Sequence, residues 1–309
     1  MKIKGIHILL TYQCNFECDH CFVWGSPWQS GVLTMVQIED VYKQAIEVGG
    51  IKEIYFEGGE AFLYYPVLLE AIGRATQLGF ESGIVTNSYW ATGYEDAWLW
   101  LRPLAAAGLN RIEISCDIFH GDEEMPAAMQ SAITAAEQLG IDTGTITVDP
   151  PTGYRDPEEA EPGATLTGGG VMYRGRAAEA LVADLPRQPW NSFTECPYEN
   201  LVDPGRIHLD PLGYLHLCQG IALGNLFERP LKEILEGYRY ENHPIAGPLV
   251  LGGPAQLVNQ YDLDPEPGYV DACHLCYSAR KALRSRFPAE LGPDQMYGVI
   301  GEQGLGTLG

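Results

Sequence analysis

Short runs of apolar and β-branched residues alternate with longer amphipathic stretches in the first half of the chain. The runs predict β-strands, and the stretches predict helices because their apolar residues recur at every third or fourth position. After the first unit, the runs begin about every 30 residues, which is the spacing of β/α units that build a parallel sheet. The pattern therefore predicts an α/β fold. The predicted strands are "IHILLTY", "EIYFE", "SGIVTN", "RIEISCD" and "TGTITV", beginning near residues 6, 53, 82, 111 and 143, with a weaker sixth candidate, "VMYRGRA", at 171–177.

The first predicted helix has the clearest boundaries. Thr34 and Gln37 have the spacing of a capping box, and Gly49 and Gly50 are residues of the kind that end helices. Its expected buried face consists of Ile38, Val41, Tyr42, Ala45 and Ile46. A second helix after Pro66 is expected to bury Leu68, Ile72, Ala75 and Leu78, and two more helices are expected at 95–107 and 123–139.

The regular alternation ends near residue 190. The stretch "RIHLDPLGYLHLC" predicts a hairpin that turns at residues 211–213, and "PLKEILEGY" and "CHLCYSARKALRSRF" predict helices. We therefore expect a first domain over residues 1–180, a smaller second domain over 190–290 and a flexible tail over 291–309. Residues 149–170 are rich in proline, glycine and acids, so we expect a loop on the catalytic side, either a lid or a solvated connector.

The net charge of the chain limits the classes of partner that can be expected. The 309 residues include 19 basic and 41 acidic side chains, which gives a net charge of −22. Such a surface repels phosphates, so nucleic acids and anionic membranes are not expected partners. The charge would favour a neutral or basic substrate, or it serves solubility alone. The N-terminal stretch lacks the features of a signal peptide, and no apolar run approaches the roughly 18 residues of a membrane span. We therefore expect a cytoplasmic protein with reduced thiols.

Three of the eight cysteines, Cys14, Cys18 and Cys21, lie close together directly after the first predicted strand. A structural zinc site needs four ligands, so zinc would require one further residue from elsewhere. An iron–sulfur cube held by three cysteines would instead keep one iron open to a small molecule. The spacing alone leaves both alternatives open.

Two further motifs follow predicted strands. Gly58, Gly59 and Glu60 follow the second strand, and "ISCDIFH" ends the fourth. Together with the C-x3-C-x2-C spacing of the three cysteines, these motifs resemble those of the radical S-adenosylmethionine (radical SAM) superfamily. The resemblance covers the first half of the chain and implies a partial (β/α)6 barrel of TIM type. The carboxyl ends of the strands, where the motifs lie, are where barrel enzymes carry their chemistry.

The resemblance also implies cofactors and their ligands. A [4Fe-4S] cluster on Cys14, Cys18 and Cys21 would bind the methionine part of S-adenosylmethionine (SAM). The chemistry of a carboxylate suits a cationic amine, and glycines permit a close backbone approach. The residues implied to contact SAM are Gly58, Gly59 and Glu60 at its amino group, Ser115 and Asp117 at its ribose, and Asn87 as a further contact. His20 takes the position of an aromatic residue beside the adenine, although an ordinary loop histidine is an equal alternative.

Side-chain alternation along the fourth strand gives a prediction that does not depend on the resemblance. Glu113, Ser115 and Asp117 share one face, and the apolar positions between them share the other. The apolar face should meet the helices, so Ser115 and Asp117 should point into the barrel and Cys116 should point outward. His120 lies near the expected mouth, where it could contact substrate or be a loop residue.

The remaining cysteines, Cys196, Cys218, Cys273 and Cys276, could bind zinc or a second iron–sulfur cluster. Their arrangement resembles the auxiliary-cluster extensions called SPASM and twitch domains, and four cysteines suggest the shorter twitch type with one [4Fe-4S] cluster. On the sixth strand candidate, residues 173, 174 and 176 could face substrate or form a surface edge.

The resemblance implies reductive cleavage of SAM to a 5′-deoxyadenosyl radical, which removes a hydrogen atom from a substrate. An external electron donor such as flavodoxin or ferredoxin is expected. The first hypothesis is oxidation or cross-linking of a peptide or protein, as in maturases of ribosomally made peptides. Because the cysteine motif begins at residue 14, we expect no separate leader-binding domain before the barrel, and a recognition protein acting in trans would remove this objection. The alternatives are a dehydrogenase of a small metabolite and a non-catalytic iron–sulfur or zinc protein.

Overall fold

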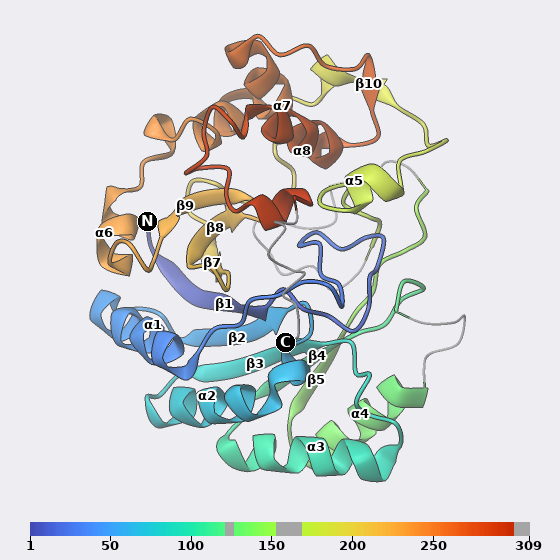
Figure 1. Ribbon diagram of the computed structural model, residues 1–309, viewed down its shortest axis with the longest axis vertical. Coiled ribbons are helices and arrows are strands. Elements are labelled where there is room, and N and C mark those ends of the chain that lie inside the picture. Colours follow the sequence, from blue (N-terminus) through green and yellow to red (C-terminus); the bar gives the residue numbers. More distant parts are fainter. Residues whose placement is uncertain (121–126, 153–168, 300–309) are drawn as a thin grey trace, which may run out of the picture.

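A computed structural model describes residues 1–120, 127–152 and 169–299. Its main feature is one eight-stranded sheet (Figure 1). The strands are β1 (Ile3–Thr11), β2 (Glu53–Gly58), β3 (Glu81–Thr86), β4 (Arg111–Ser115), β5 (Asp142–Ile146), β7 (Gly205–Leu209), β8 (Tyr214–Cys218) and β9 (Ile221–Asn225), with β6 (Gln188–Pro189) and β10 (Gly268–Tyr269) pairing separately. The order in the sheet is β5-β4-β3-β2-β1-β7-β8-β9. Parallel pairing runs from β5 through to β7, and β8 and β9 are antiparallel.

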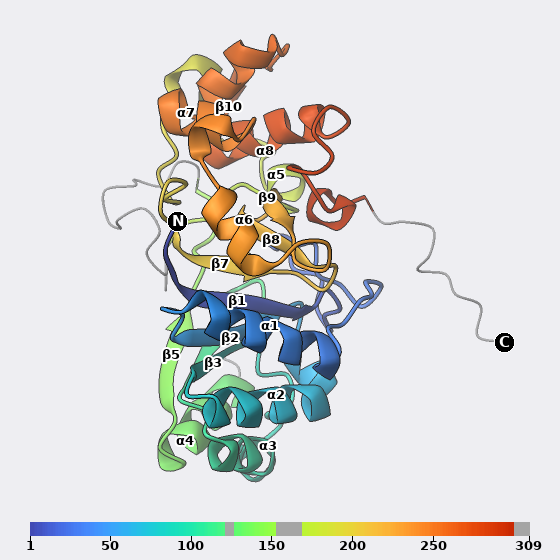
Figure 2. The ribbon, with the colours of Figure 1, turned by 90° about the vertical axis from the view of Figure 1, so that its left-hand side faces the viewer.

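Helices cover the outer face of the parallel strands and form a separate group over the hairpin strands (Figures 1 and 2). The helices are α1 (Met35–Val48), α2 (Tyr65–Gln77), α3 (Tyr94–Ala107), α4 (Ala127–Gln138), α5 (Ala177–Ala180), α6 (Leu231–Gly237), α7 (Ala246–Tyr261) and α8 (Ala272–Leu283). Short 3-10 turns lie at η1 (Ala61–Tyr64), η3 (Trp190–Ser192), η4 (Tyr240–Asn242) and η5 (Asp294–Tyr297). The predicted α/β fold with a parallel sheet is confirmed.

Alternation along the parallel strands separates a core from a cavity. Ile8 of β1, Phe56 of β2 and Ile112 of β4 are fully buried against the helices. The intervening positions carry polar side chains that line a cavity on the inner face of the sheet. Burial of apolar surface against the helices stabilises the sheet, so the inner face can have polar side chains without loss of the core.

The predicted boundaries of the first helix are confirmed. The Thr34 side chain accepts a hydrogen bond from the backbone of Gln37, and the Gln37 side chain accepts one from the backbone of Thr34. Gly49 ends the helix with a positive φ of 72°. The expectation that Ile46 is buried was wrong, because its side chain is 53% exposed while Ala45 faces the core.

The predicted sixth strand at residues 171–177 does not form. Gly175 has a φ of +62°, and a Cβ there would lie 2.3 Å from the Cα of Phe22. The backbone of Arg176 donates to the Cys21 carbonyl, so this segment bonds to the cysteine loop rather than to β5. The sixth parallel strand is instead β7, which pairs with β1 on the opposite side of the sheet.

The predicted hairpin is confirmed as β7 and β8, with the turn at residues 210–213. It extends the main sheet instead of forming a sheet of its own. The two helices predicted beyond it are confirmed as α6 and α8. The division of the chain near residue 190 into a barrel and a cluster domain stays a prediction.

Two features of the C-terminal part differ from expectation. The helix α7 was not predicted because its sequence contains Gly252, Gly253 and Pro254, and the helix kinks at the two glycines. The tail was expected to be flexible from residue 291, but Met296 and Tyr297 are each only 1% exposed. Residues 300–309 and most of the expected loop at 149–170 lie outside the described residues. No helix in the described part of the chain has the length and apolar character needed to cross a membrane.

Candidate active site

A cavity of about 580 Å³ runs along the inner face of the sheet. It extends from the first residues of β2 and β4, Glu53 and Arg111, to the loops that follow the strands. Its volume lies within the range of small-molecule sites, about 300–1,000 Å³. The predicted site residues that line it are Cys14, Cys18, Cys21, His20, Gly58, Gly59, Asn87, Ser115 and Asp117, together with His120.

The cysteine loop (residues 12–34, between β1 and α1) is held in place by its own backbone and by Arg176. The backbone of Cys14 donates to the Ser26 carbonyl at 3.0 Å. The guanidinium of Arg176 donates to the carbonyls of Cys18 at 2.6 Å and Gly25 at 2.9 Å. Arg176 was expected to face substrate or the surface, but it is buried and positions this loop.

The three sulfurs of this loop have the chemistry of a metal-cluster site. Burial, with a smaller contribution from the neighbouring thiols, raises the pKa of Cys14 and of Cys18 to about 12. Backbone N–H groups of Phe16 and Gly25 point at the sulfurs of Cys14 and Cys21, at 3.4 and 3.2 Å. Three thiolates in this buried place therefore require a positively charged group among them, which a metal centre supplies.

The size of the metal centre at Cys14, Cys18 and Cys21 can be inferred from the spacing of the donor atoms. Three thiolates on one tetrahedral zinc ion, with Zn–S bonds of about 2.3 Å, would lie about 4 Å apart. Among the described residues, the groups of three donors that all lie within 4.8 Å of one another are His7–Glu57–His208 and His20–Asp117–His120. Neither set of cysteines is among them. The wider spacing of the thiols fits a multi-iron cluster better than a single ion.

Gly58 and Gly59 bring the end of β2 against the end of β1. A Cβ at Gly58 would lie 2.4 Å from the Thr11 carbonyl oxygen, and one at Gly59 would lie 2.1 Å from that of Gln13. Glycine is therefore required by contact with the protein's own backbone, whereas sequence reasoning assigned the requirement to the ligand. The close approach leaves both glycines on the cavity wall beside Cys14.

Glu60 does not line the cavity. Its buried carboxylate accepts hydrogen bonds from the backbones of Phe62 and Asn87 and from the hydroxyl of Thr86, at 3.0, 2.8 and 2.9 Å. Burial raises its pKa to about 7, although these hydrogen bonds lower it. In the described structure Glu60 therefore positions Asn87, and its predicted direct contact with an amine stays a proposal.

The side-chain directions predicted from alternation along the fourth strand agree with the structure. Glu113, Ser115 and Asp117 line the cavity, whereas Cys116 packs against the helix-side core. One oxygen of Asp117 contacts Nδ1 of His120 at 2.8 Å and accepts from the backbone of Phe119. The other oxygen is buried without a hydrogen-bond partner in the described residues.

His20 lies against this end of β4. Its ring is 4.5 Å from that of Phe119, centroid to centroid, and its Nδ1 is buried without a hydrogen-bond partner among the described residues. Burial lowers its pKa to about 4, so the imidazole is neutral. Unpartnered polar atoms of His20 and Asp117 beside three thiols indicate a site shaped for a polar ligand.

Comparison with known proteins identifies this part of the chain. The radical SAM superfamily model matches residues 8–160. Residues 8–160 form a radical SAM domain. This agrees with the resemblance inferred from the motifs, and the superfamily is one of enzymes.

Curated relatives share parts of this domain. A protein named as a GTP 3′,8-cyclase from Methanothermobacter thermautotrophicus is 26% identical over 148 residues, which are 45% of this chain and 46% of the relative. A protein named as the peptide biosynthesis protein YydG from Bacillus subtilis is 25% identical over 120 residues, 39% of this chain and 38% of the relative. The chain therefore matches less than half the length of each of these relatives.

Solved structures match more of the chain at lower identity. BtrN in complex with AdoMet and 2-DOIA is 14% identical, with a TM-score of 0.46 over 76% of this chain and 82% of BtrN. Methylornithine synthase (PylB) is 13% identical, with a TM-score of 0.39 over 49% of this chain and 46% of PylB.

Beyond the radical SAM domain, the structure brings four distant cysteines together. Cys196, Cys218, Cys273 and Cys276 line one small cavity next to the main one. Burial raises the pKa of Cys196 to about 12 and also raises that of Cys273 and Cys276. These four thiols, called the four-cysteine group below, have donors that suit an iron–sulfur cluster.

Two buried arginines lie against the four-cysteine group. Arg174 donates to the sulfur of Cys218 at 3.0 Å and to Glu199 at 3.2 Å. Arg280 donates to the sulfur of Cys276. Arg174 lowers the pKa of Cys273 and Arg280 lowers that of Cys276, which opposes part of the increase that burial causes. Arg174 also lines the main cavity, so it separates the two sites.

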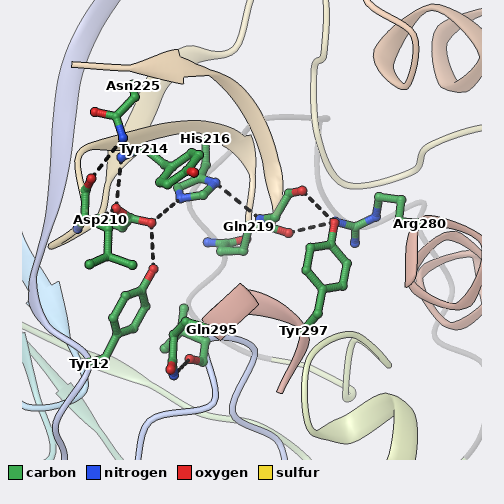
Figure 3. Close-up of polar contacts among 12 residues, drawn as sticks. Tyr12, Asp210, Tyr214, His216, Gln219, Asn225, Arg280, Gln295 and Tyr297 are labelled. Atoms are coloured by element: carbon green, nitrogen blue, oxygen red, sulfur yellow. Dashed lines mark hydrogen bonds and ion pairs between the residues drawn. The ribbon is translucent and has the colours of Figure 1, made fainter. Parts of the chain in front are cut away.

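A buried chain of hydrogen bonds connects the start of the cysteine loop with Arg280 (Figure 3). Tyr12 donates to Asp210 at 2.7 Å, and the same carboxylate oxygen contacts Nε2 of His216 at 3.0 Å. His216 accepts from the backbone of Gly220, and Arg280 donates to the adjoining carbonyl of Gln219 at 2.8 Å. These buried hydrogen bonds link the loop that carries Cys14, Cys18 and Cys21 with the helix that carries Cys273 and Cys276.

Sequence reasoning missed the polar residues on the inner faces of β1, β2 and β7. His7, Glu57 and His208 line the cavity. Side-chain alternation could have found His7, because Ile6 and Ile8 on either side face the core. His7 is a polar residue inside an otherwise apolar run, so the run predicts a buried strand and gives no direct sign of a polar site.

Proposed function

We propose that this chain is a radical SAM enzyme that reductively cleaves SAM and removes a hydrogen atom from a substrate bound in the main cavity. The observation that supports this most is the grouping of three buried thiols, two backbone glycines and the polar end of β4 around one cavity. When bound, the cluster and SAM supply an electron and a 5′-deoxyadenosyl radical. The protein's part is to bind, orient and exclude water.

Each predicted residue has a role in this proposal. Cys14, Cys18 and Cys21 would hold a [4Fe-4S] cluster. The backbone of Gly58 and Gly59 lies beside Cys14 and would face the methionine part of SAM, with Glu60 holding Asn87 in place.

Asp117 and Ser115 would accept hydrogen bonds from the ribose. His20, neutral and packed on Phe119, would face the adenine. The unpartnered atoms of Asp117 and His20 support these assignments because a buried polar atom without a partner costs about 1–3 kcal/mol.

The four-cysteine group would hold a second [4Fe-4S] cluster with no open iron. Its role would be to accept the electron left on the substrate after hydrogen removal. With an external donor such as flavodoxin or ferredoxin supplying the electron that cleaves SAM, and a cluster held by these four cysteines supplying an acceptor for one electron as the substrate radical loses a proton, the net result would be oxidation of the substrate. The proximity of the two sites across Arg174 supports this role.

For the substrate, we propose a peptide or protein side chain that becomes oxidised or cross-linked. The similarity to a peptide biosynthesis protein and the net charge of −22, which favours a neutral or basic substrate, support this choice. A small metabolite is the second candidate, because a cavity of about 580 Å³ has the size of small-molecule sites.

Release of 5′-deoxyadenosine tests the proposal. Anaerobically reconstituted protein with dithionite and SAM should release it. The variant with Cys14, Cys18 and Cys21 changed to alanine should release none. Cys116→Ala is the matched control, since Cys116 faces the helices, and should release it at the normal rate. No release from the intact protein would favour a non-catalytic metal protein.

A further inference from the structure

Three donor side chains meet on the inner face of the sheet, apart from both sets of cysteines. His7 of β1 lies directly opposite His208 of β7 in the parallel register, and Glu57 of β2 lies opposite Leu9, two positions further along β1. One oxygen of Glu57 is 3.4 Å from Nδ1 of His7 and 3.3 Å from Nε2 of His208. All three side chains line the main cavity.

These contacts are poor hydrogen bonds but good ligand-to-ligand distances. The Glu57 oxygen is buried without a hydrogen bond to any described residue, although two imidazole nitrogens flank it. Around a tetrahedral ion with bonds of about 2.0–2.1 Å, neighbouring ligand atoms lie about 3.3–3.4 Å apart. The three donor atoms also lie within 4.8 Å of one another.

Charges of both signs surround these three side chains. The acids Glu53 and Glu113 and the guanidinium of Arg111 line the same cavity, and Arg206 interacts electrostatically with both Glu57 and His208.

We propose that His7, Glu57 and His208 bind a divalent transition-metal ion such as Zn²⁺ or Fe²⁺. Two imidazoles and one carboxylate are a known ligand set for catalytic metal ions, and they leave coordination positions open. Because His7, Glu57 and His208 line the cavity, the open coordination positions of the metal ion face the space that the substrate would occupy. A carboxylate, carbonyl or amine could bind there. The proposal rests on these three residues and not on the proposed SAM chemistry.

Zinc uptake by the full chain, with its cysteines loaded as iron–sulfur clusters, tests the proposal. After equilibrium dialysis against Zn²⁺, elemental analysis should find one zinc per chain with the iron content unchanged. Glu57→Gln and His208→Asn should each weaken binding at least tenfold. Tyr55→Phe is the matched control, because Tyr55 lines the same cavity and stacks on His7 at 5.0 Å but offers no carboxylate or imidazole.

X-ray absorption of the bound zinc identifies its ligands. We expect nitrogen and oxygen neighbours at about 2.0–2.2 Å and no sulfur. Sulfur neighbours, or equal zinc uptake by wild type, Glu57→Gln and His208→Asn, would overturn the proposal, as would no uptake by the wild type. Thermal unfolding of each variant separates lost binding from lost folding, and 5′-deoxyadenosine release reports separately on the proposed SAM chemistry.

Discussion

Just past the end of β4, a shift of one position reverses the surroundings of a side chain. Asp117 points into the cavity with an unpartnered oxygen, and Cys116 packs toward the helices. Alternation along the strand predicted both directions because a strand has a strict period of two. The same rule did not reveal that Asp117 contacts His120 and lies beside His20, since that depends on the path of the loops after the strands.

We expect Asp117→Asn to slow 5′-deoxyadenosine formation about tenfold or more, because a hydrogen bond to a charged group contributes about 1.5–3 kcal/mol. Cys116→Ala should change the rate less than about twofold, since Cys116 does not line the cavity. Initial rates at saturating dithionite check both. Equal losses in the two variants would contradict the assigned directions.

Gly59 supplies a second prediction at this scale. In Gly59→Ala the new Cβ would lie 2.1 Å from the Gln13 carbonyl oxygen, so the cysteine loop must shift. We expect about 1–3 kcal/mol of lost stability and incomplete loading of the N-terminal cluster. Gly237→Ala is the control, because a Cβ there meets nothing within 4 Å. Denaturant unfolding and iron content measure both effects, and normal values for Gly59→Ala would contradict the packing described.

At the scale of elements, helices with strong local signals could be predicted, and those fixed by tertiary contacts could not. The capping box at Thr34 predicted the start of α1. The segment at 171–177 has strand-like composition, but Gly175 and Arg176 bind it to the cysteine loop instead. The kinked helix α7 had no such local signal, because Gly252, Gly253 and Pro254 interrupt its pattern and the side chain that caps its start lies before it.

That cap is His243. Its Nδ1 accepts hydrogen bonds from the backbones of Ile245 and Ala246 at 3.2 and 3.1 Å, and its Nε2 donates to the Ala222 carbonyl. Burial lowers the pKa of His243 below its ordinary value of 6.5. The contribution of this cap is therefore complete above about pH 6.5 and is lost as the pH falls, because protonation removes the acceptor.

We therefore expect wild type to lose more stability between pH 7 and pH 5 than His243→Asn, by on the order of 1 kcal/mol, since asparagine caps without titrating. Urea midpoints at both pH values measure the difference. The other histidines titrate in both proteins, so their contributions to the pH dependence of stability cancel in the comparison. An identical loss in the two proteins would show that His243 is not the titrating cap.

At the scale of the whole molecule, pairing of distant segments is the main feature that the sequence did not predict. The hairpin was predicted, but its parallel pairing with β1 was not, because register across about 200 residues leaves no local pattern. The grouping of the four distant cysteines was predicted from their number and the family resemblance, and the structure places them together. The arginines against them were not predicted, because only the fold brings Arg174 and Arg280 there.

The packed segment at 291–299 gives a prediction for the whole fold. Tyr297 is buried, stacks on Tyr277 and donates to the Gly220 carbonyl at 2.6 Å. We expect Tyr297→Ala to lower the free energy of unfolding by about 3–5 kcal/mol. Val299→Ala, at a position that is 44% exposed, should change it by less than about 0.5 kcal/mol. Equal unfolding midpoints for the two variants would support the flexible tail that the sequence suggested.

The proposed SAM cleavage requires that Cys14, Cys18 and Cys21 hold a four-iron cluster with one iron open to SAM. Mössbauer spectra of protein reconstituted anaerobically with ⁵⁷Fe, recorded with and without SAM, report on this open iron. We expect about eight irons per chain, in two four-iron clusters, with the isomer shift of one iron changed by SAM. Spectra that SAM leaves unchanged, or zinc in place of iron at the three cysteines, would contradict it.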